Sequence, residues 1–230
     1  MDAFADSFDL LVRNLPRLAE GLAFSLTLTV ASALAGLVLG IPLALMRLSA
    51  NRALSSFALA YVTFFRCVPL LLVIFWFFFL MPLVLQHATG ARFPVPIGPV
   101  YSAFITFAIF EAAYYCEIVR AGIQSVPRGQ LEAARALRLS PFDVYRHVIL
   151  PQALPRMLPV LLLQTVVLFQ DTSLVYVLTL PDFVGMAARL GQREGQLGFF
   201  YGVVAVVFFV CCFALSRAVR HLERRYGVAT

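Results

Sequence analysis

Residues 131–151 read LEAARALRLSPFDVYRHVILP, and long apolar segments lie on both sides of this polar, arginine-containing stretch. Because hydrophobic residues both precede and follow it, the stretch is a loop and not a tail. Within it, Ser140 is followed by Pro141 and by the acid Asp143, which is a pattern typical of the first turn of a helix. We therefore predict two short helices, one over about 128–139 and another that begins at Ser140.

The composition places the chain in the membrane class. Of its 230 residues, 61% are hydrophobic and only 13% are charged, and 22 are phenylalanine. A soluble domain of this length has too little interior to bury so much apolar surface. Only α-helices and closed β-barrels satisfy their backbone polar groups in lipid, and the apolar runs here are continuous, not alternating. We therefore predict an all-α membrane protein.

Five apolar segments are long enough to cross a membrane as helices. We place these spans at about 22–46, 67–85, 100–119, 157–180 and 198–215. Residues 1–20, in which Phe and Leu recur at helical spacing between acids, are predicted to form an amphipathic helix on the membrane surface. The transmembrane domain then covers 21–220, with the polar loop at 128–151 within it, and 221–230 form a tail.

Small residues recur at every fourth position in the first span. Ser32, Gly36 and Gly40 therefore lie along one side of that helix. Such a stripe allows the backbone of another helix to approach closely. We predict that a second span packs against it.

The arginines indicate the orientation in the membrane. The net charge is +6, and all 18 basic residues are arginine. They gather in the loops between spans one and two and between spans three and four, and in the tail, whereas the other two loops carry only Arg92, Arg189 and Arg193. By the positive-inside rule the N-terminus is outside and the C-terminus inside. The loop at 131–151 and the tail then face the cytoplasm.

Several classes of function are excluded by what the sequence lacks. A chain without lysine has no phosphate-binding loop of the form GxxxxGK[ST], so it does not hold ATP in that way. Its four cysteines lie in apolar runs without metal-ligand spacing: Cys67, Cys116, Cys211 and Cys212. No arrangement points to a nucleophilic triad, a zinc site or a nucleic-acid module. We expect a chain that is not an enzyme and carries no metal or cofactor of its own.

The segment EAARALRLSPFDVYRHVILP (132–151) resembles the EAA loop of bacterial ABC-importer permeases, with its Glu-Ala-Ala start and its aliphatic-x-Leu-Pro ending. Two further segments are similar to the polar amino acid permeases of this group, and above all to those of glutamate/aspartate importers: FEAAYYCEIVRAGIQSVPRGQ (110–130) and VLFQDTSLVYVLTLPDF (167–183). The resemblance covers almost the whole chain. It implies the fold of type I (MetI-like) importer permeases, in the bacterial inner membrane.

The resemblance also implies a set of partners and a function. Two copies of an ATP-binding subunit would hold ATP and magnesium, a second permease subunit, identical or distinct, would complete the path, and an extracytoplasmic binding protein would deliver substrate. The expected cargo is an acidic amino acid. Glutamine, arginine or histidine is the alternative within the family. Outside it, the alternatives are an ion-coupled secondary carrier that uses Glu111 and Asp171 as proton sites, and a membrane scaffold without transport.

The family's loop docks on the ATP-binding subunit, so the residues that match its motif become candidate coupling residues. Glu132 is either a charge on a solvated helix face or an anchor for the partner. Ala133 and Ala134 would allow the partner to approach closely. Pro151, with Pro155 behind it, would stiffen the link by ending the loop helix before the fourth span.

Arg138 stands where the family pattern has glycine between the two loop helices. Glycine adopts a left-handed turn at little cost, whereas arginine would lose roughly 1 kcal/mol or more. We therefore expect the turn either to move to Leu139–Ser140 or to be replaced by a continuous bend.

Two polar groups inside the spans are candidates for a substrate path. An isolated carboxylate such as Glu111 in hydrocarbon must be paired, protonated or facing water. It is either a structural partner of a basic or hydroxyl group on a neighbouring helix, or a ligand for the α-ammonium of the substrate, and Tyr115 shares its helix face.

The second polar group is in the fourth span. Asp171 follows Gln164 by seven residues on the same helix face and has Gln170, Thr172 and Ser173 beside it, at what we predict to be a break in the helix. These residues either line the path or form a polar interface with the second permease.

An acidic substrate also needs cationic or donor groups along its path. The candidates are Arg66, at the end of a short helix predicted at 53–66, and Arg120. Because both are placed near the cytoplasmic ends of their helices, we interpret them as topology anchors, with Arg120 paired to Glu117 three residues earlier.

Overall fold

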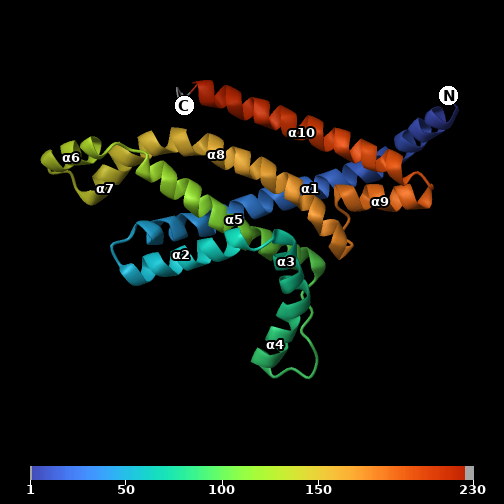
Figure 1. Cartoon of the computed structure of the whole chain (residues 1–230), viewed down its shortest axis with the longest axis horizontal. Helices are drawn as coiled ribbons and strands as arrows, with labels where there is room; N and C mark the ends of the chain where they lie inside the picture. The colour runs from blue at the N-terminus through green and yellow to red at the C-terminus, as the bar shows by residue number, and fades with distance from the viewer. Residues whose placement is uncertain (1, 226–230) are drawn as a thin grey trace.

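The computed structural model describes residues 2–225, so the second half of the tail predicted at 221–230, residues 226–230, lies outside the described residues (Figure 1). Within the described range all regular elements are helices. Five helical stretches in this range are long and apolar enough to span a membrane: Ser7–Leu48, Leu70–Thr89, Pro99–Gln124, Pro141–Leu178 and Leu197–Arg224. The number and order of the predicted spans are confirmed, although several begin earlier or end later than predicted.

The first helix, α1 (Asp2–Leu48), is a single helix of 47 residues. The expected surface helix at 1–20 is therefore not a separate element, because nothing in the described part of the chain interrupts it before the span. The reason is tertiary packing: Leu18 is buried against Phe183 and Phe200, which belong to helices from the far end of the chain.

The stripe of small residues on α1 packs against α5 (Pro99–Gln124), as predicted. A Cβ atom added at Gly36 would lie 2.9 Å from the Cβ of Glu111, and one at Gly40 would lie 3.0 Å from the carbonyl oxygen of Ala112. The two helices approach so closely that a larger side chain would push them apart. This contact forms the centre of the molecule, and α5 carries the longest series of buried residues.

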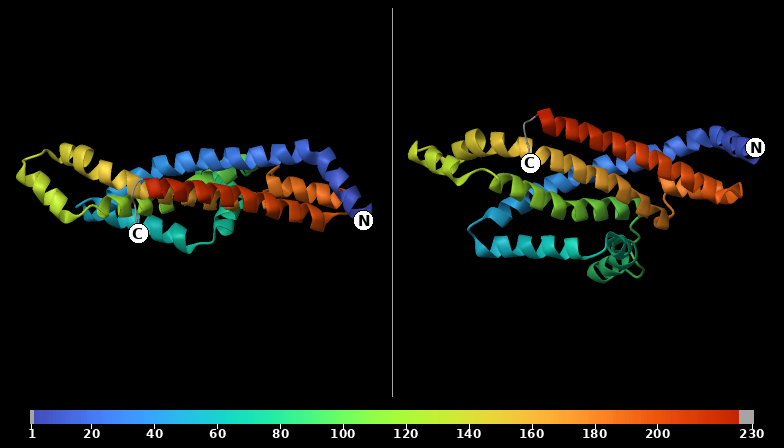
Figure 2. Two further views of the ribbon diagram at one scale, coloured as in Figure 1. Left: turned by 90° about the horizontal axis from the view of Figure 1, so that it is seen from above. Right: turned by 45° about the horizontal axis from the view of Figure 1, so that its top comes forward.

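The next elements are α2 (Arg52–Cys67), α3 (Leu70–Phe75), the π-helix η1 (Trp76–Leu80) and α4 (Met81–Thr89). The Asn51 side chain caps α2 by accepting from the backbone N–H of Ala53 at 2.9 Å. α2 then returns along α1 and α5, so it is part of the helix bundle. α3 and η1 pack against α5, with Val73 and Ile74 buried in the core, whereas α4 projects from the bundle, as Figures 1 and 2 show.

The second half of the chain contains α8 (Leu150–Asp171), the 3₁₀-helix η3 (Thr172–Leu178), α9 (Phe183–Arg193) and α10 (Leu197–Arg225). α8 packs against α5 and α10, while α9 packs between α1 and α10. The predicted break in the fourth span is confirmed, since the α-helix ends at Asp171 and continues as a tighter helix.

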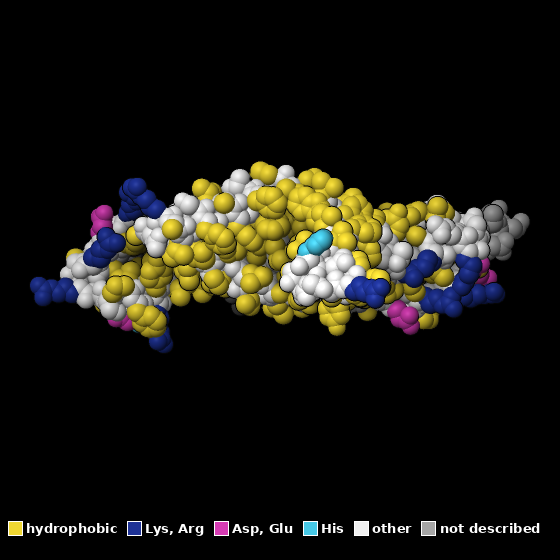
Figure 3. Space-filling view, turned by 90° about the horizontal axis from the view of Figure 1, so that it is seen from below, with side chains coloured by type: hydrophobic (Ala, Val, Ile, Leu, Met, Phe, Trp, Pro, Cys, Tyr) yellow, Lys and Arg dark blue, Asp and Glu magenta, His cyan; other side chains and the backbone are white. Residues whose placement is uncertain are grey.

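The surface of the molecule agrees with a membrane location. Figure 3 shows a broad hydrophobic middle section, with most of the arginines towards the two ends. Val38 of α1 and Phe209 of α10 are 69% and 68% exposed in this chain alone. Apolar side chains with such exposure require lipid or another membrane subunit around them.

Candidate functional site

The polar loop forms a helical hairpin at one end of the molecule, far from the N-terminus (Figures 1 and 2). It consists of α6 (Arg128–Ala136), the short α7 (Pro141–Asp143) and the π-helix η2 (Val144–Ile149), which leads into α8. The Ser140 hydroxyl accepts from the backbone N–H of Asp143 at 3.2 Å and donates to its carboxylate at 2.6 Å. The helix start predicted at Ser140 is confirmed.

The turn between the two loop helices differs from both expectations. Arg138 itself takes the left-handed conformation, with φ of 55°. Its N–H donates to the carbonyl of Arg135 at 2.9 Å, and the N–H of Leu139 donates to that of Ala134 at 3.2 Å. This pair of bonds is the usual glycine-type helix ending. The turn is neither shifted nor replaced by a bend, because the two bonds offset the strain of a side chain at this position.

The small residues of the motif face in different directions. Ala134 is 3% exposed and packs against Val144 and Ile149 inside the hairpin. Its predicted role as a contact surface for a partner is therefore wrong: its small size allows η2 to approach α6. Glu132 and Ala133 are exposed, so they remain available to another protein.

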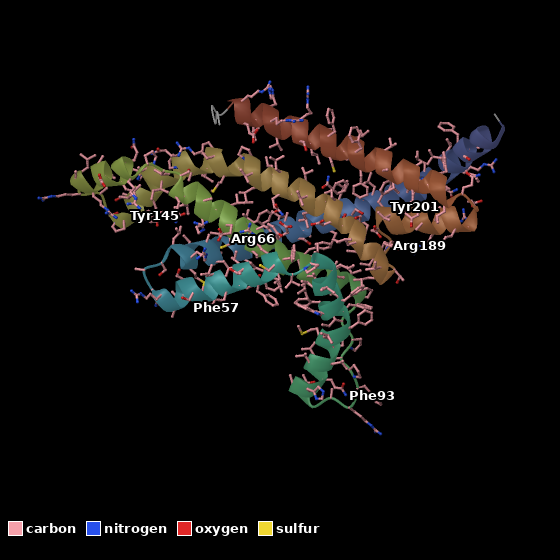
Figure 4. All side chains as sticks on the ribbon, viewed as in Figure 1. Phe57, Arg66, Phe93, Tyr145, Arg189 and Tyr201 are labelled. Atoms are coloured by element: carbon pink, nitrogen blue, oxygen red, sulfur yellow. The ribbon has the colours of Figure 1, made fainter. Side chains whose placement is uncertain are left out.

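Apolar side chains at the tip of the hairpin were missed by the sequence analysis. Leu137 is 75% exposed and Phe142 is 68% exposed, and Tyr145, labelled in Figure 4, is 41% exposed. They alternate with arginines in a segment outside the spans. Large apolar residues next to arginines in a solvated loop could have indicated this surface from the sequence, because such residues are usually covered by a partner protein.

Pro151 does not end the loop helix, contrary to the expectation. The helical stretch Pro141–Leu178 is continuous, and it passes through the π-helix η2 just before the proline. There the N–H of Leu150 donates to the carbonyl of Tyr145, five residues earlier. A wider turn relieves the clash that a proline ring makes with the preceding turn. The second arm of the hairpin, formed by α7 and η2, is therefore continuous with α8.

Glu111 and Gln164 join α5 to α8 at the centre of the bundle. Glu111 is 1% exposed, and the Gln164 amide donates to its two carboxylate oxygens at 3.2 and 3.3 Å. The partner of this carboxylate is thus an amide, not the basic or hydroxyl group that we expected. The structure brings these two predicted path residues together as an interhelical tie.

Tyr115 is enclosed and does not line an open surface. Its ring is 2% exposed, its Cβ lies next to Gly40, and its hydroxyl lies 2.9 Å from that of Thr165 on α8. The neighbouring Tyr114 is only half-buried, and the Arg66 guanidinium lies over its ring at 5.6 Å from the centroid. Tyr114, which was not among the predicted site residues, is therefore better placed than Tyr115 to line a substrate path.

The polar residues at the break in the fourth span differ in burial and therefore in the roles open to them. Thr172 is fully buried and donates to the carbonyl of Phe169 at 2.7 Å, so it serves the local turn. Asp171 and Ser173 are half-buried and Gln170 is exposed.

The pairing predicted for Arg120 is confirmed. Its Nε and Nη2 atoms donate to one Glu117 oxygen at 3.0 and 2.6 Å, while Arg47 of α1 lies 3.4 Å from the other. Arg66, in contrast, does not lie at a cytoplasmic end, because α2 runs back into the bundle and brings it to Tyr114.

Asp182 is a buried carboxylate on the opposite side of the molecule from the hairpin. It caps α9 by accepting from the N–H groups of Val184 and Gly185 at 3.1 and 3.2 Å. Burial raises its pKa to about 6, against the lowering effect of these bonds. Next to it, the N–H of Phe183 donates to the hydroxyl of Ser25 on α1. This cluster is structural. Among residues 2–225 no group of three or more His, Cys, Asp or Glu side chains is arranged to hold a metal.

Comparison with known proteins gives a consistent result. Residues 36–228 match the family model described as the binding-protein-dependent transport system inner membrane component. The glutamate/aspartate import permease protein GltK of Escherichia coli O6:H1 is 44% identical over 215 residues, which cover 94% of this chain and 96% of that protein. The nopaline transport system permease protein NocM of Agrobacterium fabrum is 32% identical, over 93% of this chain and 89% of its own length.

A solved structure has the same architecture. The crystal structure of an amino acid ABC transporter with histidines contains a chain that superposes with a TM-score of 0.84 at 29% sequence identity. The match covers 94% of this chain and 96% of the other.

Proposed function

The chain belongs to the family of binding-protein-dependent transport system inner membrane components, and from this premise we propose that it carries acidic amino acids, L-glutamate and L-aspartate, through the membrane. It has the fold of type I ABC-importer permeases and is a multi-pass protein of the bacterial inner membrane. The single observation that supports the substrate is the 44% identity, over nearly the full length, to a glutamate/aspartate permease.

ATP hydrolysis in this proposal takes place on a separate ATP-binding subunit, present in two copies, which holds ATP and magnesium. The helical hairpin provides the docking surface. Leu137 and Phe142 would enter an apolar groove on that subunit, with Glu132 as a charged contact on the exposed face of α6. The exposure of two large apolar side chains outside the membrane supports this role.

Movement of the hairpin would reach the spans through α8. Because the helical stretch 141–178 is continuous, displacement at Phe142 shifts the whole of α8, including Gln164. Gln164 holds Glu111 of α5 by two hydrogen bonds. The hairpin, α8 and α5 thus form a connected series of contacts through which the ATP-binding subunits would open and close the path.

Asp171 is the proposed ligand for the α-ammonium group of the substrate. It stands half-buried at the junction of α8 and η3, inside a span, where a carboxylate attracts a cationic group. Glu111 does not bind the substrate directly in this proposal. Its hydrogen bonds with Gln164 join α5 to α8, and its negative charge adds to that of Asp171 near the path. A second permease subunit would complete the path, and an extracytoplasmic binding protein would deliver the substrate.

The test is uptake of labelled L-glutamate into proteoliposomes that contain the assembled importer, with ATP inside and the binding protein outside. We expect uptake that stops without ATP and continues with an uncoupler. Uptake that the uncoupler abolishes would instead show an ion-coupled carrier.

Competition tests the substrate. The relative named for nopaline shows that the family takes different cargoes. Unlabelled aspartate should compete with glutamate, whereas glutamine, arginine and histidine should not. Competition by glutamine, arginine or histidine alone would assign the permease to another polar amino acid.

A further inference from the structure

A cavity of about 410 Å³ lies between α5, α8 and the last turn of α2. Its volume is within the range of roughly 300–1,000 Å³ that is typical of small-molecule sites. It follows the last turns of α5, from Glu117 to Ser125, on the side of Glu111 that leads to the hairpin. At Gly122 the wall is so close to α8 that an added Cβ would lie 2.8 Å from the Cβ of Met157.

The lining of this cavity is positively charged. Three arginines reach it from three different helices: Arg66 of α2, Arg120 of α5 and Arg156 of α8. Glu117 is the acid among its lining residues, so the lining carries a net charge of +2. Arg66 is exposed and Arg156 is half-buried, so positive charge faces the cavity and attracts an anion.

The three arginines are not equally available to a ligand. Arg120 is engaged on all sides, because its Nε and Nη2 donate to Glu117 and its Nη1 donates to Gln124. It forms a nearly neutral part of the wall together with Glu117. The excess charge therefore belongs to the other two arginines.

Arg66 and Arg156 have donors to spare. Arg66 makes no hydrogen bond or ion pair with the described residues, and its guanidinium lies over the ring of Tyr114. Stacking on a ring leaves the edge of a guanidinium free to bind a carboxylate. Arg156 uses only Nη1, which donates to the carbonyl and the hydroxyl of Ser125 at 2.6 and 3.2 Å. Figure 4 shows Arg66 where α2 meets α5, in the middle of the molecule.

We propose that Arg66 and Arg156 form a subsite for the carboxylate of an acidic amino acid, on the cytoplasmic side of Glu111 along the path. The inference rests on the proposed function, because the carboxylate assigned to this subsite is the side-chain carboxylate that distinguishes an acidic amino acid from other cargoes. The substrate would leave the acidic region around Asp171, which attracts its ammonium group, and enter a basic cavity before release. The two helices α5 and α8 that carry this cavity are those that Glu111 and Gln164 tie together.

The experiment measures equilibrium binding of labelled L-glutamate to the assembled importer in phosphatidylcholine nanodiscs, without ATP and without the binding protein. Arg66→Gln and Arg156→Gln should each weaken binding by about ten- to hundredfold, which is the effect of one lost charge-assisted hydrogen bond. Arg66→Lys, which keeps the charge, should recover part of the loss and shows that the variant chains assemble.

Arg217→Gln is the matched control. Arg217 also lies over an aromatic ring, that of Phe213 at 5.8 Å, but it does not line the cavity. If Arg66→Gln and Arg156→Gln bind glutamate as well as Arg217→Gln does, the subsite is refuted while uptake of glutamate by the wild type keeps the proposed function. If the wild type takes up no glutamate with ATP and binding protein present, the proposed function fails and the subsite with it.

An anionic lipid headgroup shares the chemistry of a carboxylate, and a further measurement separates the two. Phosphatidylglycerol added to the nanodiscs should leave glutamate binding unchanged. If it abolishes glutamate binding, and if it is retained by the purified wild type but lost with Arg66→Gln, the arginines hold lipid and the proposal is overturned.

Discussion

The side-chain amide of Gln164 on α8 donates to both carboxylate oxygens of Glu111 on α5, at 3.2 and 3.3 Å. Glu111 is 1% exposed, and on its other side the backbone of α1 approaches at Gly36. This buried contact joins the two helices that carry the candidate path. It also connects the acid in the third span with the helix that continues from the cytoplasmic hairpin.

Replacing Gln164 by leucine should destabilise the protein, because the buried carboxylate of Glu111 loses its partner. We expect a loss of about 1–3 kcal/mol in the free energy of unfolding, measured by thermal or denaturant unfolding in detergent. Gln192→Leu, which changes an exposed amide on α9, is the control and should stay within about 0.5 kcal/mol. Equal stability of the two variants would show that the hydrogen bonds between Gln164 and Glu111 do not stabilise the fold.

Arg138→Gly should stabilise the protein, because glycine adopts a φ of 55° without the clash of a side chain. The expected gain is about 1 kcal/mol. Arg135→Gly, three residues earlier within α6, should instead cost about 0.5–1 kcal/mol, since its backbone is helical. Unfolding measurements on both variants decide the matter, and a loss of stability in Arg138→Gly would contradict the prediction.

Phe142→Ala should weaken the association with the ATP-binding subunit. Removing an apolar anchor from the centre of an interface costs about 2 kcal/mol or more, so the dissociation constant should rise at least tenfold. Phe93→Ala is the matched control, because Phe93 is 71% exposed but lies in the loop before α5, away from the hairpin. Affinity measured with purified subunits should change only in the first variant.

Glu132→Lys should leave membrane insertion intact and abolish co-purification of the ATP-binding subunit, because it reverses an exposed charge on the proposed docking face of α6. Glu20→Lys, which reverses an exposed charge on α1, should co-purify normally. Normal co-purification together with normal uptake in Glu132→Lys would refute the coupling role.

Asp182 should make the stability of the protein depend on pH. Because its pKa is about 6 in the folded chain and 3.8 otherwise, the folded state holds the proton more firmly. Its contribution to stability is therefore present at low pH and is lost as the pH rises from about 4 to above 6. Asp182→Asn has no charge to bury, so the stability of the wild type relative to this variant should fall across that window. A difference that stays constant with pH would contradict the assignment.

Much of the fold was predictable, because its signals are local. Hydropathy over about twenty residues predicted the five spans, and the stripe at Ser32, Gly36 and Gly40 predicted a close helix contact. The pattern around Ser140 predicted the start of the second loop helix. The break at Asp171 followed from several consecutive polar residues in a span, which lipid does not tolerate in a regular helix facing it.

The errors lie where a residue's neighbours come from elsewhere in the chain. Ala134 looked like a docking residue, but η2 covers it. Tyr115 shared a helix face with Glu111 in the sequence pattern, yet Thr165 and α1 enclose it. Pro151 was expected to end a helix, and a π-turn before it accommodates the ring instead.

By itself, the sequence determined the class, the spans, the family and the position of the polar loop, since these depend on composition and on spacing within one segment. Only the tertiary structure decided which side chains meet. It paired Glu111 with Gln164, turned α2 back into the bundle, and brought Arg66 and Arg156 to one cavity although 90 positions separate them. The physical reason is that helical periodicity specifies which face a residue occupies, whereas its partner depends on how helices cross.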